Sequence, residues 1–189
     1  MTRIVGIAGS LRQGSYNEAL LRAAAEVAPA GTEVEVASIA GIPLYDADVE
    51  RERGLPAAVT ELKERIAAAA GLLLVTPEYN ASIPGVFKNA VDWLSRPPQD
   101  SAKVFGDRPV ALLGATPGVG GTRLAQAAWL PVLRALGARV WSGRQLYVAG
   151  ATQVFDPAGA LVDEKVRRLL AEFMAGFAQF ASGSPANER

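Results

Sequence analysis

Residues 9–17 combine polar side chains with a predicted helix start, and this combination suits an anion. They follow an apolar, strand-like run, and a helix N-terminus offers unpaired N–H groups and a partial positive charge. Hydroxyl, amide and guanidinium groups of the same loop could add hydrogen bonds and charge; they belong to Ser10, Arg12, Ser15 and Asn17. The dinucleotide fingerprint and the P-loop are both absent, because the glycine spacing differs and the loop has no lysine. The pattern predicts a phosphate site of another type; the alternative is an N-capped turn with Arg12 on the surface.

Residues 77–85 form a second loop after a strand-like run, and this loop suits a flat heterocycle. Its two prolines make the backbone rigid, and Pro84 fits the first turn of a helix. Tyr79 supplies a ring, while Glu78 and Asn80 supply polar side chains. Open α/β sheets bind their ligands at the carboxyl ends of their strands. A heterocycle site beside a phosphate site therefore predicts a mononucleotide ligand.

Residues 114–122 form a third loop, which is rich in glycine. Glycine permits positive φ and a close approach of the backbone to a ligand. In a doubly wound sheet this loop would lie beside the other two, at the point where the strand order reverses. The alternative is a flexible connection between a strand and a helix.

The elements that must position these loops alternate between strand and helix. Strand-like apolar runs cover residues 4–8, 34–39, 72–76, 110–115 and 140–148. Helix-like stretches cover residues 17–28, 56–70, 84–95, 121–136 and 163–181. The alternation predicts an α/β protein with a flavodoxin-like, doubly wound, five-stranded parallel sheet of order 2-1-3-4-5 and helices on both faces; half of a six-stranded Rossmann fold fits less well. We expect one domain over residues 1–181 and a frayed tail over residues 182–189.

Several local features carry their own expectations. A proline inside the fourth helical stretch, Pro131, predicts a kink or two short helices. Residues 151–162 indicate an exposed turn, and the acidic residues of segment 46–52 indicate a solvated connection. Lys88 and Asp92 are spaced to pair on one helix face. Trp93 lies off the apolar stripe of that helix, which favours a subunit interface for its ring; the alternative is a ring that lies over the surface.

The composition excludes several kinds of chemistry. Among its 189 residues the chain has no Cys and no His, which removes disulfides, thiolate nucleophiles and histidine general bases. We therefore expect no metal site and no catalytic side chain. Lys+Arg and Asp+Glu balance at 19 each, so no nucleic-acid or membrane-surface partner is indicated. The absence of a secretory signal and of a membrane-length apolar run favours a cytoplasmic protein.

With these motifs assembled, the chain resembles the NADPH-dependent FMN reductase family, in particular its bacterial chromate/quinone reductase branch. The resemblance rests on segments spread over nearly the whole chain, which are residues 9–17, 42–46, 76–80 and 82–96. It implies bound FMN, NADPH or NADH as electron donor, and a homodimer or homotetramer. It also implies a set of FMN contacts: Ser10, Arg12, Ser15, Tyr16 and Asn17 at the phosphate, Pro77, Glu78, Tyr79 and Asn80 at the isoalloxazine ring, and Thr116 from the third loop. The third loop departs from the family pattern because it is slightly shorter and poorer in hydroxyl residues.

Flavin chemistry suits a chain without His or Cys, because the cofactor itself carries the electrons. The expected reaction passes electrons from NAD(P)H through FMN to a small-molecule acceptor, such as a quinone, chromate, a nitro compound or free flavin. The alternatives are a flavodoxin-type electron carrier, an azoreductase or free-flavin reductase, and a flavin-free NAD-binding protein. The sequence does not choose among acceptors, between NADPH and NADH, or between dimer and tetramer.

Overall fold

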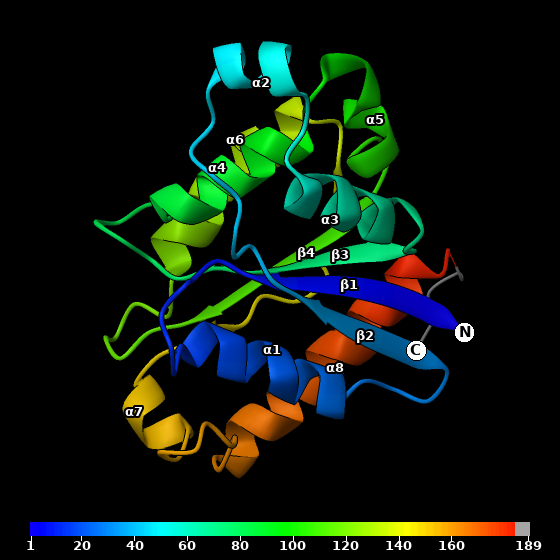
Figure 1. Cartoon of the computed structure of the whole chain (residues 1–189). Helices are drawn as coiled ribbons and strands as arrows, with labels where there is room; N and C mark the ends of the chain where they lie inside the picture. Colours follow the sequence, from blue (N-terminus) through cyan, green and yellow to red (C-terminus); the bar gives the residue numbers. More distant parts are fainter. Residues whose placement is uncertain (184–189) are drawn as a thin grey trace.

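The computed structural model describes residues 1–183, in which a parallel sheet lies between two layers of helices (Figure 1). The strands are β1 (Thr2–Ala8), β2 (Thr32–Ala37), β3 (Gly71–Val75), β4 (Pro109–Ala115), β5 (Arg139–Val140) and β6 (Tyr147–Val148). Their order is β2-β1-β3-β4-β5, with β6 also paired to β4, and every pairing is parallel. The predicted flavodoxin-like class and strand order are confirmed. A single domain over residues 1–181 stays a prediction, and the expected frayed tail lies, from residue 184 onward, outside the described residues.

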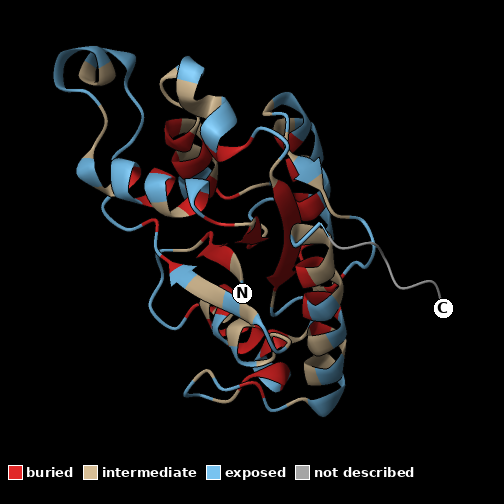
Figure 2. Cartoon of the chain, turned by 90° about the vertical axis from the view of Figure 1, so that its right-hand side faces the viewer, coloured by how far each residue is buried: buried red, intermediate tan, exposed pale blue. Residues whose placement is uncertain are grey.

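The helices divide between the two faces of the sheet. They are α1 (Tyr16–Glu26), α2 (Ala47–Arg53), α3 (Ala57–Ala67), α4 (Gly85–Leu94), the 3₁₀ helix η1 (Pro98–Asp100), α5 (Ser101–Val104), α6 (Arg123–Ala135), α7 (Ala151–Val154) and α8 (Glu164–Ala181). Helices α1, α7 and α8 pack on one face, and α3, α4, α5 and α6 pack on the other. Buried residues accordingly line the sheet and the inner sides of both helix layers (Figure 2).

The apolar run of β3 shows why the prediction of a central strand is confirmed. Successive side chains of a strand point to opposite faces, and a strand covered on both faces is apolar throughout. Leu72 and Leu74 belong to the core under α3, α4 and α6, whereas Leu73 and Val75 belong to the core under α1 and α8. This fully buried central strand fixes the position of the loop that follows it.

The predicted last strand, residues 140–148, is wrong as one element. Two short strands replace it, and residues 141–146 leave the sheet edge between them. The partly buried Trp141 ring packs against the core, edge-on to Phe173 of α8 with 4.8 Å between ring centroids. Residues 142–145, which follow it, are all exposed and include no apolar side chain, so nothing holds this part of the run against the sheet.

The segment 151–162 is not an exposed turn. It begins with α7, and three of its apolar residues, Ala151, Phe155 and Leu161, are buried in the core beneath α1 and α8. Only the tip near Asp156 has the expected turn, where its N–H donates to the carbonyl of Ala160 at 3.0 Å. The segment therefore supports the loops above it.

Pro131 does not divide the fourth helical stretch. Helix α6 runs without interruption from Arg123 to Ala135, so two short helices are excluded, and the kink expected as the other possibility stays a prediction. Pro131 and Ala127, whose carbonyl loses its helical partner, are both exposed. Water can satisfy that carbonyl, which makes the proline tolerable on this side of the helix.

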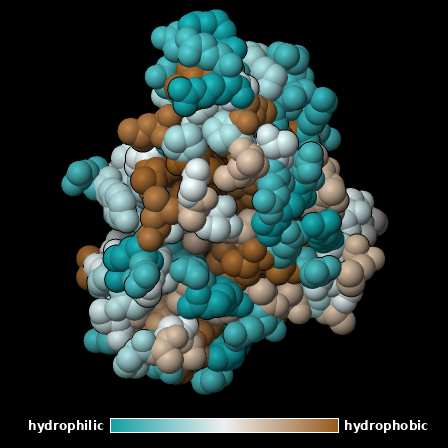
Figure 3. Space-filling model, in the orientation of Figure 1, coloured by the Kyte–Doolittle hydropathy of each residue, from teal (hydrophilic) through white to brown (hydrophobic). Residues whose placement is uncertain are grey.

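The acidic segment 46–52 is not a plain solvated connection, because most of it forms α2, capped by Asp46. No residue of α2 is buried, and the helix projects from the top of the molecule (Figure 1). The surface of this region is largely hydrophilic (Figure 3). Glu50 nevertheless anchors it, since this carboxylate accepts hydrogen bonds from Arg96 Nε and from Tyr45 OH, both at 2.9 Å. The segment between β2 and α2, residues 38–46, is thereby tied to the end of α4; we call it the arm before α2.

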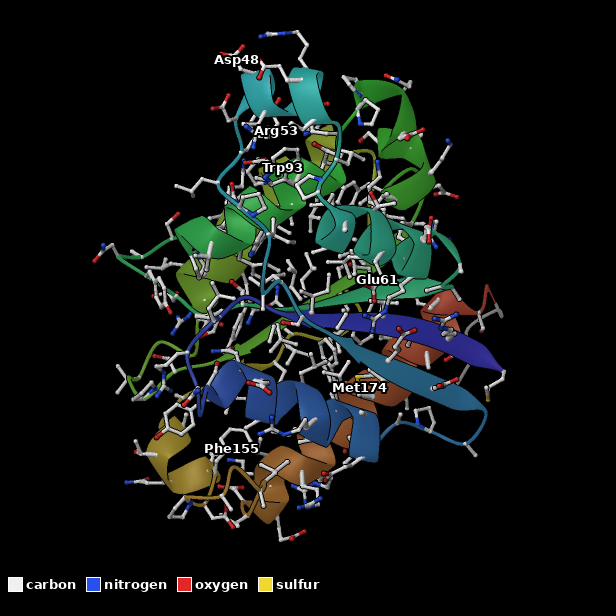
Figure 4. The ribbon with its side chains drawn as sticks, viewed as in Figure 1. Asp48, Arg53, Glu61, Trp93, Phe155 and Met174 are labelled. Atoms are coloured by element: carbon white, nitrogen blue, oxygen red, sulfur yellow. The ribbon has the colours of Figure 1, made fainter. Side chains whose placement is uncertain are left out.

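This arm also accounts for Trp93, whose predicted place in a subunit interface is wrong. The Trp93 side chain is fully buried beneath the arm, as the side-chain view indicates (Figure 4). Its Nε1 donates to the carbonyl of Pro43 at 2.9 Å, and the Tyr45 ring lies edge-on to it at 4.9 Å. The predicted Lys88–Asp92 pair on the same helix is confirmed at 2.7 Å.

Candidate functional site

The loops after β1, β3 and β4 meet at one edge of the sheet and enclose a cleft of about 320 Å³. Strand register brings them together, because the Gly9 N–H donates to the Val75 carbonyl at 2.9 Å and the Thr76 N–H donates to the Leu113 carbonyl at 2.8 Å. The cleft is lined by Ser10, Arg12, Ser15, Tyr16, Asn17, Pro77, Glu78, Tyr79, Ala115, Thr116 and Pro117. The structure therefore brings together every predicted site residue except Asn80.

The start of α1 offers hydrogen-bond donors at one end of the cleft. Ser15 is its extended N-cap residue, and no side chain caps the helix. The first intrahelical bond runs from the Ala19 N–H to the Ser15 carbonyl at 3.0 Å. Within the described part of the chain, the N–H groups of residues 16–18 therefore have no acceptor. A helix end in this state suits an anionic group such as a phosphate.

Arg12 adds a positive charge beside this helix end. Its guanidinium donates to the Gly14 carbonyl at 2.9 Å and lies 5.6 Å from the centroid of the Tyr16 ring. Among residues 1–183 no carboxylate pairs with it at salt-bridge distance. The charge is consequently available to an anion in the cleft.

Asn17 has a different role from the side-chain phosphate contact expected for it. Its Nδ2 donates to the Ala115 carbonyl and its Oδ1 accepts from the Ala115 N–H, both at 2.9 Å. The amide thus replaces a strand neighbour for the end of β4 and ties α1 to the third loop. Toward the cleft, Asn17 offers its backbone N–H.

The second loop ends in a tight hairpin turn. Tyr79 and Ser82 exchange backbone hydrogen bonds at 3.0 and 3.1 Å. Between them, Asn80 and Ala81 have φ values of 49° and 62°, the signature of a type I′ turn. The turn leaves the Tyr79 ring half exposed at the cleft and carries Asn80 away from it.

Glu78 joins the second loop to the third. Its Oε2 accepts hydrogen bonds from the N–H groups of Leu124 at 2.8 Å and Ala125 at 3.1 Å. These donors lie in the first turn of α6, whose own N-cap residue, Thr122, makes no side-chain cap. The carboxylate is therefore a cap supplied by another loop, and the helix dipole favours its negative charge.

The third loop is fixed from below by the start of α7. The Thr116 carbonyl accepts from the Ala151 N–H at 3.0 Å, and the Gly118 carbonyl accepts from the Gly150 N–H at 3.1 Å. The loop also contributes Ala115 and Pro117 to the cleft, which the sequence analysis did not include. Pro117 could have been found, since it directly follows Thr116 in the same loop.

The residues present fit FMN. Donors and a cation without an acidic partner lie at one end of the cleft, as a phosphate requires, and rigid backbone with an aromatic ring lies at the other end. The cleft is within the range of about 300–1,000 Å³ typical of ligand pockets. The donors without a partner at the cleft are the backbone N–H groups at the start of α1. Among the described residues, no buried side-chain polar atom lacks a partner.

Comparisons with known proteins agree with this geometry. A family model described as NADPH-dependent FMN reductase matches residues 2–153. The chain is 44% identical over 168 residues to an NAD(P)H-dependent FMN reductase of Pseudomonas aeruginosa, and the match covers 89% of each chain. It is 39% identical over 180 residues to a quinone reductase of Escherichia coli, with 94% of each chain covered. Its structure is similar to that of FerB, a flavoenzyme NAD(P)H:(acceptor) oxidoreductase from Paracoccus denitrificans, with a TM-score of 0.86, 31% identity, and coverage of 97% of this chain and 98% of that chain.

The Pseudomonas aeruginosa and Escherichia coli relatives match most of the chain at 44% and 39% identity. They confirm the predicted enzyme class, with FMN as cofactor and a nicotinamide as electron donor, and they do not favour the flavodoxin-type carrier. The chain belongs to the NADPH-dependent FMN reductase family.

Proposed function

We propose that the protein binds FMN in the cleft between the three loops and passes electrons from NAD(P)H through it to quinones. One observation carries the proposal: a single cleft combines two kinds of binding surface. An uncapped helix start and Arg12 lie at one end, and a rigid loop with an aromatic ring lies at the other. A mononucleotide with an anionic end and a flat end matches both halves. Quinones are favoured as acceptors because the Escherichia coli relative is named a quinone reductase.

When bound, FMN would supply the redox chemistry, which is the transfer of a hydride from the nicotinamide and of electrons to the acceptor. The protein's own residues bind and orient it. The first turn of α1 would hold the phosphate together with Arg12, Ser10 and Ser15, while Pro77, Glu78 and Tyr79 would position the ring. Thr116 and Pro117 would border it from the third loop. Backbone N–H groups of the second and third loops would stabilise the negative charge that develops on the reduced ring, because they are already held in place and need not reorganise.

No side chain of the cleft is assigned as a proton donor. Glu78 is the one carboxylate that lines it, and this group is held by two N–H groups of α6. The cleft is open to solvent, as the half-exposed Tyr79 indicates, so water supplies the protons. The protein contributes binding, orientation and electrostatics.

Chromate, nitro compounds, azo compounds and free flavin are further proposed acceptors, and the proposed location is the cytoplasm. Among the described residues no helix is both long and apolar enough to span a membrane. We also propose a homodimer or homotetramer. Large exposed hydrophobic side chains on the arm before α2, on α4 and on α6 support it; they are Leu44, Val86, Leu124 and Leu130.

The test is an anaerobic absorbance titration of the purified protein with FMN, followed by NADPH or NADH. Binding of FMN and bleaching of its long-wavelength band by the nicotinamide, with reoxidation by a quinone, is the expected result. Binding without bleaching would point to an electron carrier, and failure to bind FMN would reject the proposal. Light scattering on the same sample gives the oligomeric state.

A further inference from the structure

A buried chain of hydrogen bonds lies directly beneath the second loop. The Trp129 Nε1 donates to Thr76 Oγ1 at 3.2 Å, and Thr76 Oγ1 lies 2.8 Å from the Pro77 carbonyl oxygen, to which its hydroxyl donates. Both side chains are fully buried, and the Trp129 ring packs edge-on against Phe87 with 5.0 Å between centroids. The core of the protein thus holds one particular carbonyl of the loop.

This bond fixes the orientation of a whole peptide unit. A trans peptide is planar, and its C=O and N–H groups point in opposite directions. The Pro77 carbonyl points inward to the buried Thr76 hydroxyl, so the Glu78 N–H points the other way. Within residues 1–183 this N–H has no acceptor, and both Pro77 and Glu78 line the cleft. The loop therefore offers a donor to a ligand.

The donor matters because Pro77 has no N–H of its own. If the Pro77–Glu78 peptide turned over, a carbonyl oxygen would face the ligand in place of the donor. The edge of the isoalloxazine ring is rich in nitrogen and oxygen acceptors, so a carbonyl there would repel it. The Glu78 carboxylate, held by α6, restrains the far side of the same peptide.

We propose that Thr76 is a positioning residue, which locks the Pro77–Glu78 peptide with its N–H toward the flavin ring. This inference rests on the proposed binding of FMN in the cleft. Trp129 acts one step further back, since it orients the Thr76 hydroxyl toward the Pro77 carbonyl. Neither residue touches the ligand, so both act through the peptide.

Four variants separate the hydroxyl from the packing of the side chain. Thr76→Val keeps the shape and removes the hydroxyl, while Thr76→Ser keeps the hydroxyl. Trp129→Phe removes the second donor together with part of a fully buried ring, so it also lowers stability. In Thr76→Val the Trp129 Nε1 loses its acceptor and the protein loses stability, whereas Thr76→Val with Trp129→Phe removes both partners and avoids an unpaired buried donor.

We expect Thr76→Val and the double variant to bind FMN about tenfold more weakly, the effect of about one hydrogen bond. Thr76→Ser should stay within about twofold of the wild type, whereas Trp129→Phe should lose up to about threefold, because the Thr76 hydroxyl keeps its bond to Pro77 but loses the donor that orients it. Fluorescence titration gives the Kd, and thermal unfolding of the FMN-free protein gives stability. Hydrogen exchange of the Glu78 N–H reads the peptide directly: FMN should protect it in the wild type and in Thr76→Ser, and much less in the double variant.

Two results would overturn the inference. The first is a double variant with wild-type Kd and full protection of the Glu78 N–H. The second is an equal loss of affinity in Thr76→Ser and Thr76→Val, since a variant that keeps the hydroxyl would then bind FMN no better than one that lacks it. A wild-type protein that fails to bind FMN would instead reject the proposed function, and the inference with it.

Discussion

The two ends of the cleft are built in different ways. Residues 10–14, at the phosphate end, are tied internally by hydrogen bonds that all lie on the surface, such as those from Arg12 to Ser10 Oγ and to the Gly14 carbonyl. The ring end, residues 76–82, is fixed by the buried Thr76 hydroxyl, by the Glu78 cap on α6 and by the Tyr79–Ser82 turn. The phosphate end offers N–H groups without an acceptor, and the ring end is fixed by hydrogen bonds to the core and to α6.

The difference follows from what each ligand group requires. A phosphate is attracted by charge and by several N–H groups at once, so a loop that adjusts by small movements still binds it. A ring edge needs a donor at one place and in one direction, because hydrogen bonds weaken steeply with angle. The ring end therefore needs to be rigid, whereas the phosphate end does not.

The largest effect is expected where the phosphate loop meets the core. A Cβ at Gly9 would lie 2.0 Å from the ring of Phe87, which is fully buried. Gly9→Ala should destabilise the FMN-free protein by about 3 kcal/mol in urea unfolding, because a packed aromatic ring must shift. Gly14 is the matched control in the same loop, since it has nothing within 4 Å and a φ of +66°.

Gly14→Ala should cost about 1 kcal/mol, from the positive φ alone. Equal losses for the two variants would contradict a core-anchored start of the loop. A larger loss at Gly14 would show that the conformation of the loop, and not its contact with Phe87, limits stability.

Removal of the Glu78 carboxylate tests how the ring end is held. Glu78→Ala should destabilise the protein by about 1–2 kcal/mol, the usual cost of a lost helix cap. FMN affinity should fall as well, because the second and third loops separate. Glu78→Gln keeps one acceptor oxygen and should show about half of the loss in unfolding experiments.

Glu164 provides the control for that variant. It is an exposed carboxylate in the first turn of α8, where Asp163 already caps the helix. Glu164→Ala should change stability by less than about 0.5 kcal/mol. Similar losses at both positions would mean that Glu78 acts by its charge at a helix end and not as a link between loops.

These contacts mark the limit of what the sequence could predict. The strands and the meeting of the three loops follow from local patterns, since an apolar run such as Leu72–Val75 and a proline at a helix start act within a few residues. The hydrogen bonds that fix the cleft join distant segments: Asn17 bonds Ala115, 98 residues away, and Glu78 bonds Leu124, 46 residues away. The spacing of apolar residues along the sequence does not indicate which distant residues form hydrogen bonds.

The missed elements have the same cause. Helix α2 and the arm before it are stabilised through Tyr45, Trp93 and Arg96, and α7 is stabilised by burial beneath α1 and α8. Short segments of this kind have little helical preference of their own and depend on tertiary contacts. Asn80 was expected at the ring because its type suits it, whereas the positive-φ turn carries it outward.

The phosphate end gives the next smaller prediction. Arg12→Ala should weaken FMN binding about tenfold, through the loss of one charge-assisted contact, and should leave stability unchanged. The affinity of the wild type should fall with added salt more steeply than that of the variant. Fluorescence titrations over a range of salt concentrations measure both.

Riboflavin sharpens this test because it lacks the phosphate. Arg12→Ala should bind riboflavin as well as the wild type does, since the ring end is untouched. Arg22→Ala, which removes an exposed arginine of α1 paired with Glu18, is the charge control and should alter neither affinity. A loss of riboflavin binding in Arg12→Ala would contradict the division of the cleft into two ends.

The smallest effect is expected at the tip of the ring-end loop, and its sign is opposite. Ala81 has a φ of 62°, a conformation that costs an L residue about 1 kcal/mol or more, whereas glycine adopts it freely. Glycine also has more freedom to lose on folding, so Ala81→Gly should stabilise the protein by only about 0.5 kcal/mol. Asn80→Gly should gain less, because asparagine tolerates this region of φ.

FMN affinity should stay within about twofold, since neither residue lines the cleft. A clear loss of affinity in Ala81→Gly would mean that the strained tip helps to hold the ring; unchanged affinity would assign the rigidity of this end to its hydrogen bonds alone.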